Sequence, residues 1–261
     1  MSASIAARAA ALLDAERTGT TIVPMTEADP QLDVETAYAI QAETLRERLG
    51  RGEHLTGIKL GLTSVAKQRR MGVDTPIVAW LTDAMSLPLG TPLPGGLIHP
   101  RVEPEIVFVL GQRLAGPGVT AARALEAVAS VRGGLEVIDS RFADFRFGLA
   151  DVIADNASSG RYVLGPLARR AEALDLALEA CLLSLDGRVV DSATGAAVLG
   201  HPAEALALAA NLLGRRGLAL EEGWTVLTGG MTDAVAVAPG HSIRAEFTHL
   251  GSLTLRRSSD G

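Results

Sequence analysis

The chain has 261 residues, of which 48% are hydrophobic and 21% are charged, and its formal net charge is -6. A chain of this size and apolarity can bury a full core, so we expect one large domain with a small N-terminal elaboration. The negative charge and the lack of basic runs argue against nucleic-acid binding. We find no apolar stretch long enough to cross a bilayer and no signal peptide, and therefore expect a cytoplasmic protein without membrane contact.

The first part of the chain combines helices with two short strands. Helical composition covers residues 3–16 and 33–49, and strand-like runs surround Lys59 and extend from Ile77 to Leu81. Residues 88–100 are rich in Pro and Gly, which indicates an irregular connection. We therefore predict an N-terminal helical and mixed region over 1–90, which contributes Lys59, and a β-rich catalytic core over 91–261.

The second part of the chain is richer in strand-like runs. After the acidic segments described below, we expect a helix over 120–130, a hairpin over 174–190 and a helix from His201 to about Arg215. Residues 224–257 alternate short β-like runs with Gly and Pro turns. Because strands and helices do not alternate regularly, the pattern predicts an α+β fold rather than a doubly wound sheet.

Two glutamates lie two positions apart within the apolar run 101–110, RVEPEIVFVL. If this run is a strand, Glu103 and Glu105 point from the same face, and the apolar residues after them indicate burial on both sides. Two buried carboxylates need a compensating cation, and oxygen ligands suit a hard divalent metal. The alternative is that the strand enters from solvent at Pro104 and leaves both glutamates on an exposed edge.

A third carboxylate, Glu136, lies in another short apolar run, 133–141. Together with Glu103 and Glu105 it would give three oxygen ligands on two strands. No Cys or His cluster accompanies these acids, which favours Mg²⁺ or Mn²⁺ over zinc. Asp139 is a rival third ligand, although pairing with Arg141 or capping a turn explains it equally well.

The chain has two lysines, Lys59 and Lys67, while arginine supplies its other basic side chains. Lys67 lies in a polar, helix-like stretch, where we expect it to be solvated. Lys59 is surrounded by apolar neighbours and bracketed by glycines, which indicates a compact amine that can be desolvated and can exchange a proton. The alternative is a lysine at a strand end whose amine reaches solvent.

Six motifs, in this order along nearly the whole chain, together resemble the hydratase/decarboxylase branch of the fumarylacetoacetate hydrolase superfamily. They are 58–64 (IKLGLTS), 102–105 (VEPE), 135–141 (LEVIDSR), 154–160 (ADNASSG), 195–202 (GAAVLGHP) and 227–230 (LTGG). The resemblance implies a central rolled mixed β-sheet with a smaller N-terminal α/β region. It also implies a Mg²⁺ or Mn²⁺ site at Glu103, Glu105 and Glu136, with Lys59 as a catalytic amine.

The implied substrate is a small 2-oxo dicarboxylic acid of aromatic meta-cleavage catabolism. The expected reaction is decarboxylation of 2-oxo-3-hexenedioate (4-oxalocrotonate) to 2-hydroxypenta-2,4-dienoate. Candidates for binding substrate oxygens are Arg141, Ser158, Ser159 and Arg161, although residues 155–160 can also be a structural turn. We expect a homo-oligomer, with the possibility of a complex with a related hydratase.

Three other functions stay open. A 2-oxopent-4-enoate hydratase would use the same site, but we expect an acidic residue after Pro76 in hydratases, where this chain has Ile77. An apolar residue there keeps water away and suits a decarboxylase. A non-catalytic partner subunit of a hydratase is disfavoured, because it has no reason to bury the charges of the acid triad. A carbon–carbon bond hydrolase is not supported by residues outside the shared metal set.

Overall fold

The computed structural model describes residues 3–64, 68, 69, 71–73 and 75–259. The prediction about Lys67 therefore lies outside the described residues. The α-helices are α1 (Ile5–Thr18), α2 (Met25–Ala28), α3 (Val34–Gly50), α5 (Ala121–Glu126), α6 (Leu149–Ala154) and α7 (Pro202–Gly214). The strands are β1 (Leu55–Gly61), β2 (Ile77–Thr82), β3 (Arg101–Leu110), β4 (Val128–Ile138), β5 (Ser159–Leu164), β6 (Ala180–Leu185), β7 (Arg188–Thr194), β8 (Thr225–Leu227), β9 (Val235–Ala236), β10 (Ser242–Phe247) and β11 (Gly251–Arg256).

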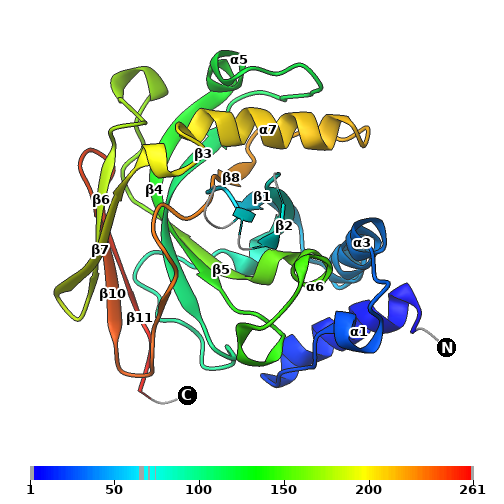
Figure 1. The fold of residues 1–261 in the computed structure, drawn as a ribbon. Helices are drawn as coiled ribbons and strands as arrows, with labels where there is room; N and C mark the ends of the chain where they lie inside the picture. The colour runs from blue at the N-terminus through cyan, green and yellow to red at the C-terminus, as the bar shows by residue number, and fades with distance from the viewer. Residues whose placement is uncertain (1–2, 65–67, 70, 74, 260–261) are drawn as a thin grey trace.

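A curled mixed sheet forms the centre of the molecule (Figure 1). Its strands follow the order β2-β1-β8-β3-β4-β5, and β9 pairs with the first residues of β3. Within this sheet β1 and β8 are parallel, and the other described pairs are antiparallel. The predicted α+β fold with a central rolled mixed sheet is confirmed.

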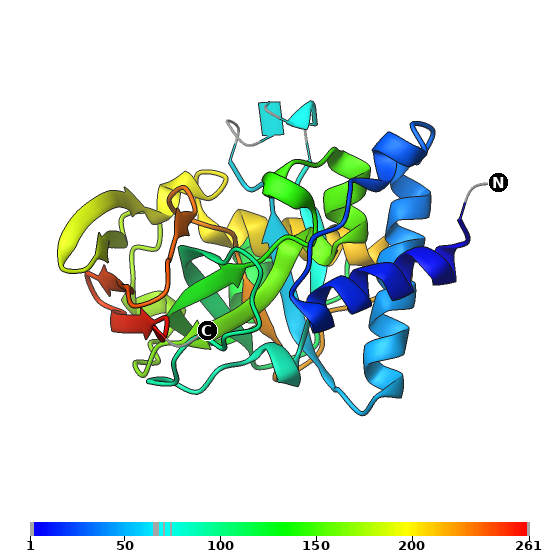
Figure 2. The ribbon, with the colours of Figure 1, turned by 90° about the horizontal axis from the view of Figure 1, so that it is seen from below.

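Two further layers lie at opposite ends of this sheet (Figure 2). On one side, β11, β10, β6 and β7 form a second, antiparallel sheet. On the other side, α1 and α3 pack against α6 and β2 through buried side chains that include Leu12, Ile40, Ala79 and Ile153. This helical layer is the smaller N-terminal part that the sequence indicates.

Local sequence signals mark the starts of several helices. The Asp33 side chain accepts a hydrogen bond from the Thr36 amide and caps α3, while His201 caps α7 directly before Pro202. The predicted helices over 3–16, 33–49 and 201–215 are therefore close to the observed ones. The helix expected over 120–130 instead ends at Glu126, because the chain from Val128 onward pairs with β3.

The central sheet continues across the expected division at residue 90. Strands β1 and β2 precede this position, yet β1 pairs with β8, which in turn pairs with β3. The main hydrophobic core likewise contains Ile58 from β1 beside Phe108 from β3. The division into regions 1–90 and 91–261 stays a prediction, and the structure places both on one sheet.

Helix α7 belongs to the main core. By length and composition, Gly195–Gly214 has the character of a membrane-spanning segment, contrary to the expectation from the sequence. Half of that segment is buried inside the protein, where Ala205, Leu206 and Ala209 join the core. The 13 residues of α7 extend about 20 Å at 1.5 Å per residue, which is shorter than a hydrocarbon core of about 30 Å. We therefore interpret α7 as a core helix.

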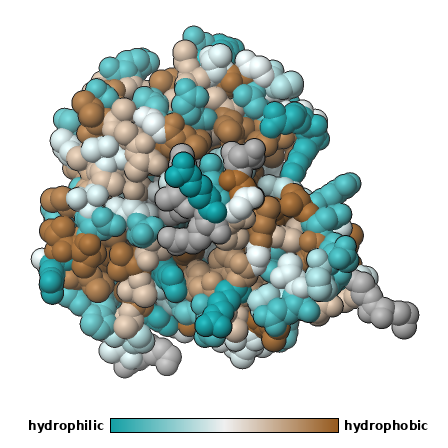
Figure 3. Space-filling view, viewed as in Figure 1, coloured by the Kyte–Doolittle hydropathy of each residue, from teal (hydrophilic) through white to brown (hydrophobic). Residues whose placement is uncertain are grey.

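Apolar residues gather on the surface over the second sheet. In Figure 3 hydrophobic atoms concentrate at the left edge, over the region where β6 and β7 lie in Figure 1. The exposed large side chains there include Leu182, Val189 and Val190. Elsewhere on this face hydrophilic and hydrophobic residues are interspersed.

Candidate active site

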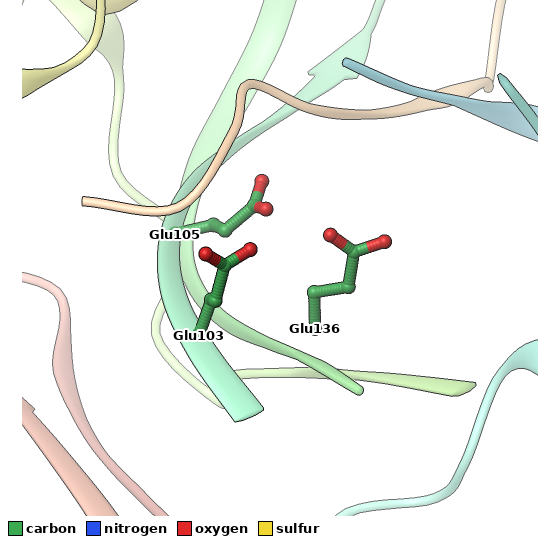
Figure 4. A group of neighbouring side chains, drawn as sticks. All are labelled: Glu103, Glu105 and Glu136. Atoms are coloured by element: carbon green, nitrogen blue, oxygen red, sulfur yellow. The ribbon is translucent and has the colours of Figure 1, made fainter. Parts of the chain in front are cut away.

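Three glutamates converge between two paired strands (Figure 4). Glu103 on β3 lies opposite Glu136 on β4, and Glu105 follows two residues later on the same side of β3. Each offers an oxygen within 4.8 Å of those of the other two. Their exposed fractions are 7%, 2% and 0% for Glu103, Glu136 and Glu105 respectively, which excludes the alternative of an exposed edge.

Burial and mutual repulsion make this cluster unfavourable without a cation. Desolvation, followed by the charges of Glu136 and Glu103, raises the pKa of Glu105 well above its ordinary value. Desolvation also raises the pKa of Glu136, with Lys59 opposing and Glu103 adding to the effect. A divalent cation would favour the ionised form of all three side chains.

The hydrogen bonds of the cluster leave room for such a cation. The amide of Gly229 donates to Oε2 of Glu105 over 2.7 Å. Oε1 of the same carboxylate is buried and has no hydrogen-bond partner within the part of the chain that the structure describes. A buried acceptor without a donor is costly, so this oxygen points to a ligand site. The residues present therefore fit a hard divalent metal.

Lys59 approaches the cluster from β1. Its Nζ lies 3.1 Å from Oε1 and 3.3 Å from Oε2 of Glu136, and only the longer contact has hydrogen-bond geometry. The lysine is 3% exposed, so the alternative of an amine that reaches solvent is wrong. Its ammonium group offsets part of the negative charge of the triad.

Two consecutive glycines after β8 allow the chain to approach the triad. Gly229 has φ +110°, and a side chain there would overlap with Thr63. A Cβ at Gly230 would lie 2.5 Å from the carboxyl carbon of Glu103. In the sequence these glycines stand out only as part of a family motif. A Gly-Gly pair directly after a buried strand is the signal that indicates such a close approach.

A cavity of about 690 Å³ opens above the triad. Its charged and polar lining comes from Lys59, Glu103, Arg101, Arg146, Ser158 and Asp233. Apolar side chains complete the wall, among them Ile77, Phe145, Phe147 and Val152. A cavity of this size accepts a small organic acid.

An unusual backbone turn forms one part of the cavity wall. Asn156, Ala157 and Ser158 have φ angles of +50°, +51° and +57°, and the last two line the cavity. Left-handed conformations cost free energy in residues with a side chain, and a surrounding structure must hold them. The Asn156 side chain does so, because it accepts from the Trp80 amide at 2.8 Å and donates to the Trp80 carbonyl at 2.9 Å.

Of the residues predicted to bind substrate, Ile77 and Ser158 line the cavity, whereas Arg141, Ser159 and Arg161 are absent from its lining. The guanidinium of Arg141 forms a buried ion pair with Asp155 and donates to the carbonyls of Asp139 and Ser159. These contacts give Arg141 a structural role, and its binding of substrate stays a prediction.

The remaining predicted polar groups also have internal partners. The Ser159 hydroxyl donates to the Asn156 carbonyl, and Arg161 donates to the Gly160 carbonyl. Ser159 and Arg161 therefore fit the alternative that this segment is a structural turn. Asp139 is not a metal ligand, since its carboxylate accepts from the amides of Ile98 and His99.

Comparison with known proteins agrees with the fold. The family model "Fumarylacetoacetate (FAA) hydrolase C-terminal" matches residues 58–256. The chain is 44% identical over 228 residues to a 4-oxalocrotonate decarboxylase of Pseudomonas putida, covering 87% of this chain and 86% of the relative. It is 39% identical over 246 residues to a 2-keto-4-pentenoate hydratase of Paraburkholderia xenovorans, with 94% and 91% covered.

A solved structure has the same architecture. The 4-oxalocrotonate decarboxylase from Pseudomonas putida G7, complexed with magnesium and adipate, superimposes with a TM-score of 0.94 at 40% identity, and 97% of each chain is covered. The chain therefore belongs to the fumarylacetoacetate hydrolase family, as its motifs indicated. The relatives at 44% and 39% identity bear decarboxylase and hydratase names respectively.

The raised pKa values predict that metal affinity depends on pH. Protons compete with the metal for Glu105 and Glu136 at a higher pH than for ordinary glutamates, so binding strengthens as pH rises. We expect Mg²⁺ to bind more tightly at pH 8 than at pH 6, measured by calorimetry. Glu105→Gln removes one titrating ligand and should weaken binding at both pH values. Equal affinity at both pH values in the wild type would contradict this model.

The Arg141–Asp155 pair should be essential for stability. Asp155→Ala leaves a guanidinium with an exposed fraction of 5% without its counter-charge, which we expect to cost about 3–5 kcal/mol in urea unfolding. Glu126→Ala breaks an exposed ion pair with Arg123 and is the matched control, with an expected cost of about 1 kcal/mol or less. Similar losses in both variants would refute the structural role of Asp155.

Proposed function

We propose that this protein is a lyase that decarboxylates 2-oxo-3-hexenedioate (4-oxalocrotonate) to 2-hydroxypenta-2,4-dienoate. The observation that carries the proposal is the buried glutamate triad beside Lys59, since Lys59 and Glu103 line a cavity of about 690 Å³. The names of the relative at 44% identity and of the solved structure at 40% identity support this substrate.

Glu103, Glu105 and Glu136 would hold Mg²⁺ or Mn²⁺, since oxygen donors without Cys or His suit these ions. When bound, the metal polarises the keto group and one carboxylate oxygen of a 2-oxo acid. The Gly229 amide fixes one oxygen of Glu105 and thereby orients this ligand. The chain thus prepares the site before substrate binds.

The reaction breaks the carbon–carbon bond to the carboxylate remote from the keto group. The electron pair moves through the conjugated chain to the keto oxygen, where the product takes up one proton. Lys59 is the ammonium group of the cavity wall beside the triad. It can supply that proton or stabilise the negative charge that develops, and both roles require a buried amine at this place.

An apolar wall supports decarboxylation over hydration. Ile77 follows Pro76 and lines the cavity together with Val152 and Ala157. None of these side chains can orient or deprotonate a water molecule, so the wall protects the reactive chain from hydration. The runner-up is a 2-oxopent-4-enoate hydratase, which the relative at 39% identity keeps open.

The cellular location and the assembly state of the protein are also proposals. We infer a cytoplasmic homo-oligomer that associates with a related hydratase, which would receive the dienoate product. The exposed apolar side chains of Leu182, Val189 and Val190 offer a surface for subunit contact. A non-catalytic subunit is disfavoured, because burying the triad and Lys59 costs free energy and brings no benefit to a subunit without chemistry.

Product analysis tests the proposed reaction. Purified protein with Mg²⁺ is mixed with fresh 2-oxo-3-hexenedioate, and separately with 2-hydroxypenta-2,4-dienoate, and the products are followed by NMR. We expect carbon dioxide and the pentadienoate from the first and no change in the second. Hydration of only the second compound would identify a hydratase, and no turnover of either would favour the partner-subunit alternative.

Two substitutions separate the charge of Lys59 from its ability to transfer a proton. Lys59→Met should lower kcat by about 10²-fold or more. Mg²⁺ should bind this variant at least as tightly as the wild type, since a repelling charge is lost beside the triad. Lys59→Arg keeps the charge but cannot release a proton, so recovery of turnover would assign an electrostatic role. Full activity of Lys59→Met would remove the lysine from the mechanism.

A further inference from the structure

Two arginines in the cavity wall have no role in the mechanism described so far. We propose that Arg101 and Arg146 form an anion subsite that binds the second carboxylate of the substrate, the one remote from the metal-chelating end. Both residues line the same cavity as Glu103 and Lys59. The identity of that carboxylate rests on the proposed function, whereas the preference for dicarboxylic acids rests on the subsite itself.

Arg101 has the right position along the strand. It begins β3 and lies two residues before Glu103, so it shares the strand face of the triad. Two strand residues span about 6.6 Å, and five carbon–carbon bonds of about 1.5 Å in a zigzag give an extended six-carbon diacid roughly 6 Å. The backbone positions of Arg101 and Glu103 on one face of β3 are therefore separated by about the length of the substrate.

The charge of both arginines is available. Neither forms an ion pair with a carboxylate among the described residues, whereas Arg141 is fully engaged by Asp155. The Cζ atom of Arg101 lies 4.1 Å from the centre of the Phe145 ring, a cation–π contact that leaves the N–H groups for a ligand. Arg101 is half-buried, whereas Arg146 and Asp233 lie at the exposed side of the same cavity.

The backbone beside this subsite is strained. Asp144 and Phe145 have φ angles of +57° and +56°, a left-handed conformation that is unfavourable for residues with a side chain. Phe145 and Arg146 both line the cavity, so the strained segment presents the aromatic ring and the second guanidinium to the same space. Strain of this kind persists where the surrounding structure holds it and is typical of ligand clamps.

The subsite would select between the two substrate classes of the family. A 2-oxo dicarboxylic acid has a carboxylate for Arg101 and Arg146, whereas the substrate of a 2-oxopent-4-enoate hydratase has only its chelating end. Two charge-assisted contacts made by one class alone are enough to discriminate strongly between them.

Binding of two inert acids tests the subsite. Adipate and hexanoate have six carbons each, and only adipate carries a second carboxylate. With Mg²⁺-loaded protein, calorimetry should give at least roughly tenfold tighter binding of adipate. Arg101→Met and Arg146→Met should each weaken adipate binding by roughly tenfold while changing hexanoate binding by less than about twofold. Arg188→Met, at an exposed site on β7, is the control and should change neither.

The outcomes separate this proposal from its alternatives. Equal loss of adipate and hexanoate binding in Arg101→Met would mean that this arginine holds the chelating end of the acid. Unchanged binding of both acids would mean that it holds neither end. Either result overturns the subsite. Unchanged Mg²⁺ affinity verifies that the variant is folded. Arg101→Lys keeps the charge without the bidentate fork and should recover part of the adipate preference.

Turnover adds a second readout. The remote carboxylate loses its charge as carbon dioxide leaves, so contacts to it stabilise the bound substrate more than the transition state. Arg101→Met should therefore raise KM about tenfold without lowering kcat, whereas a general structural defect would lower kcat. If wild-type protein releases no carbon dioxide but prefers adipate through Arg101, the proposed function fails and the subsite stands. If it releases carbon dioxide without a preference for adipate, the subsite fails and the proposed function stands.

Discussion

The structure depends on the burial of three like charges between two strands. Glu103, Glu105 and Glu136 cannot all stay ionised in this place without positive charge beside them. Lys59 supplies one charge, and the Glu105 oxygen that has no partner among the described residues indicates where a cation supplies the rest. Because this arrangement costs free energy, the surrounding chain must hold the three carboxylates in fixed positions.

The rest of the fold serves to position this charge cluster. The antiparallel register of β3 and β4 places Glu103 opposite Glu136, and the parallel pairing of β1 with β8 brings Lys59 within reach of them. The second sheet and α7 pack with the central sheet in one apolar core that fixes these strands. A site with little freedom to move can hold metal and substrate without the free-energy cost of reorganisation.

Some residues of the cavity lining serve the reaction, and others select the substrate. Lys59 and Glu103 of the triad line the cavity, its wall contains Ile77 and other apolar groups, and two arginines lie in the same lining. A decarboxylase and a hydratase of this family can share the triad and Lys59 and differ in the wall, since activated water is needed by only one of them. The left-handed turn at 156–158 shows that the wall is held against backbone strain.

The sequence alone identified the family, the α+β class and the acid triad, because strand periodicity places Glu103 and Glu105 on one face and motif order is a property of the chain. The apolar neighbours of Lys59 also predicted a buried amine, and the structure buries it beside Glu136. Only the tertiary structure decided that Arg141 pairs with Asp155 whereas Arg101 and Arg146 line the cavity. An arginine looks the same in the sequence whether its partner is internal or a ligand, and only the contacts made by distant segments distinguish these cases.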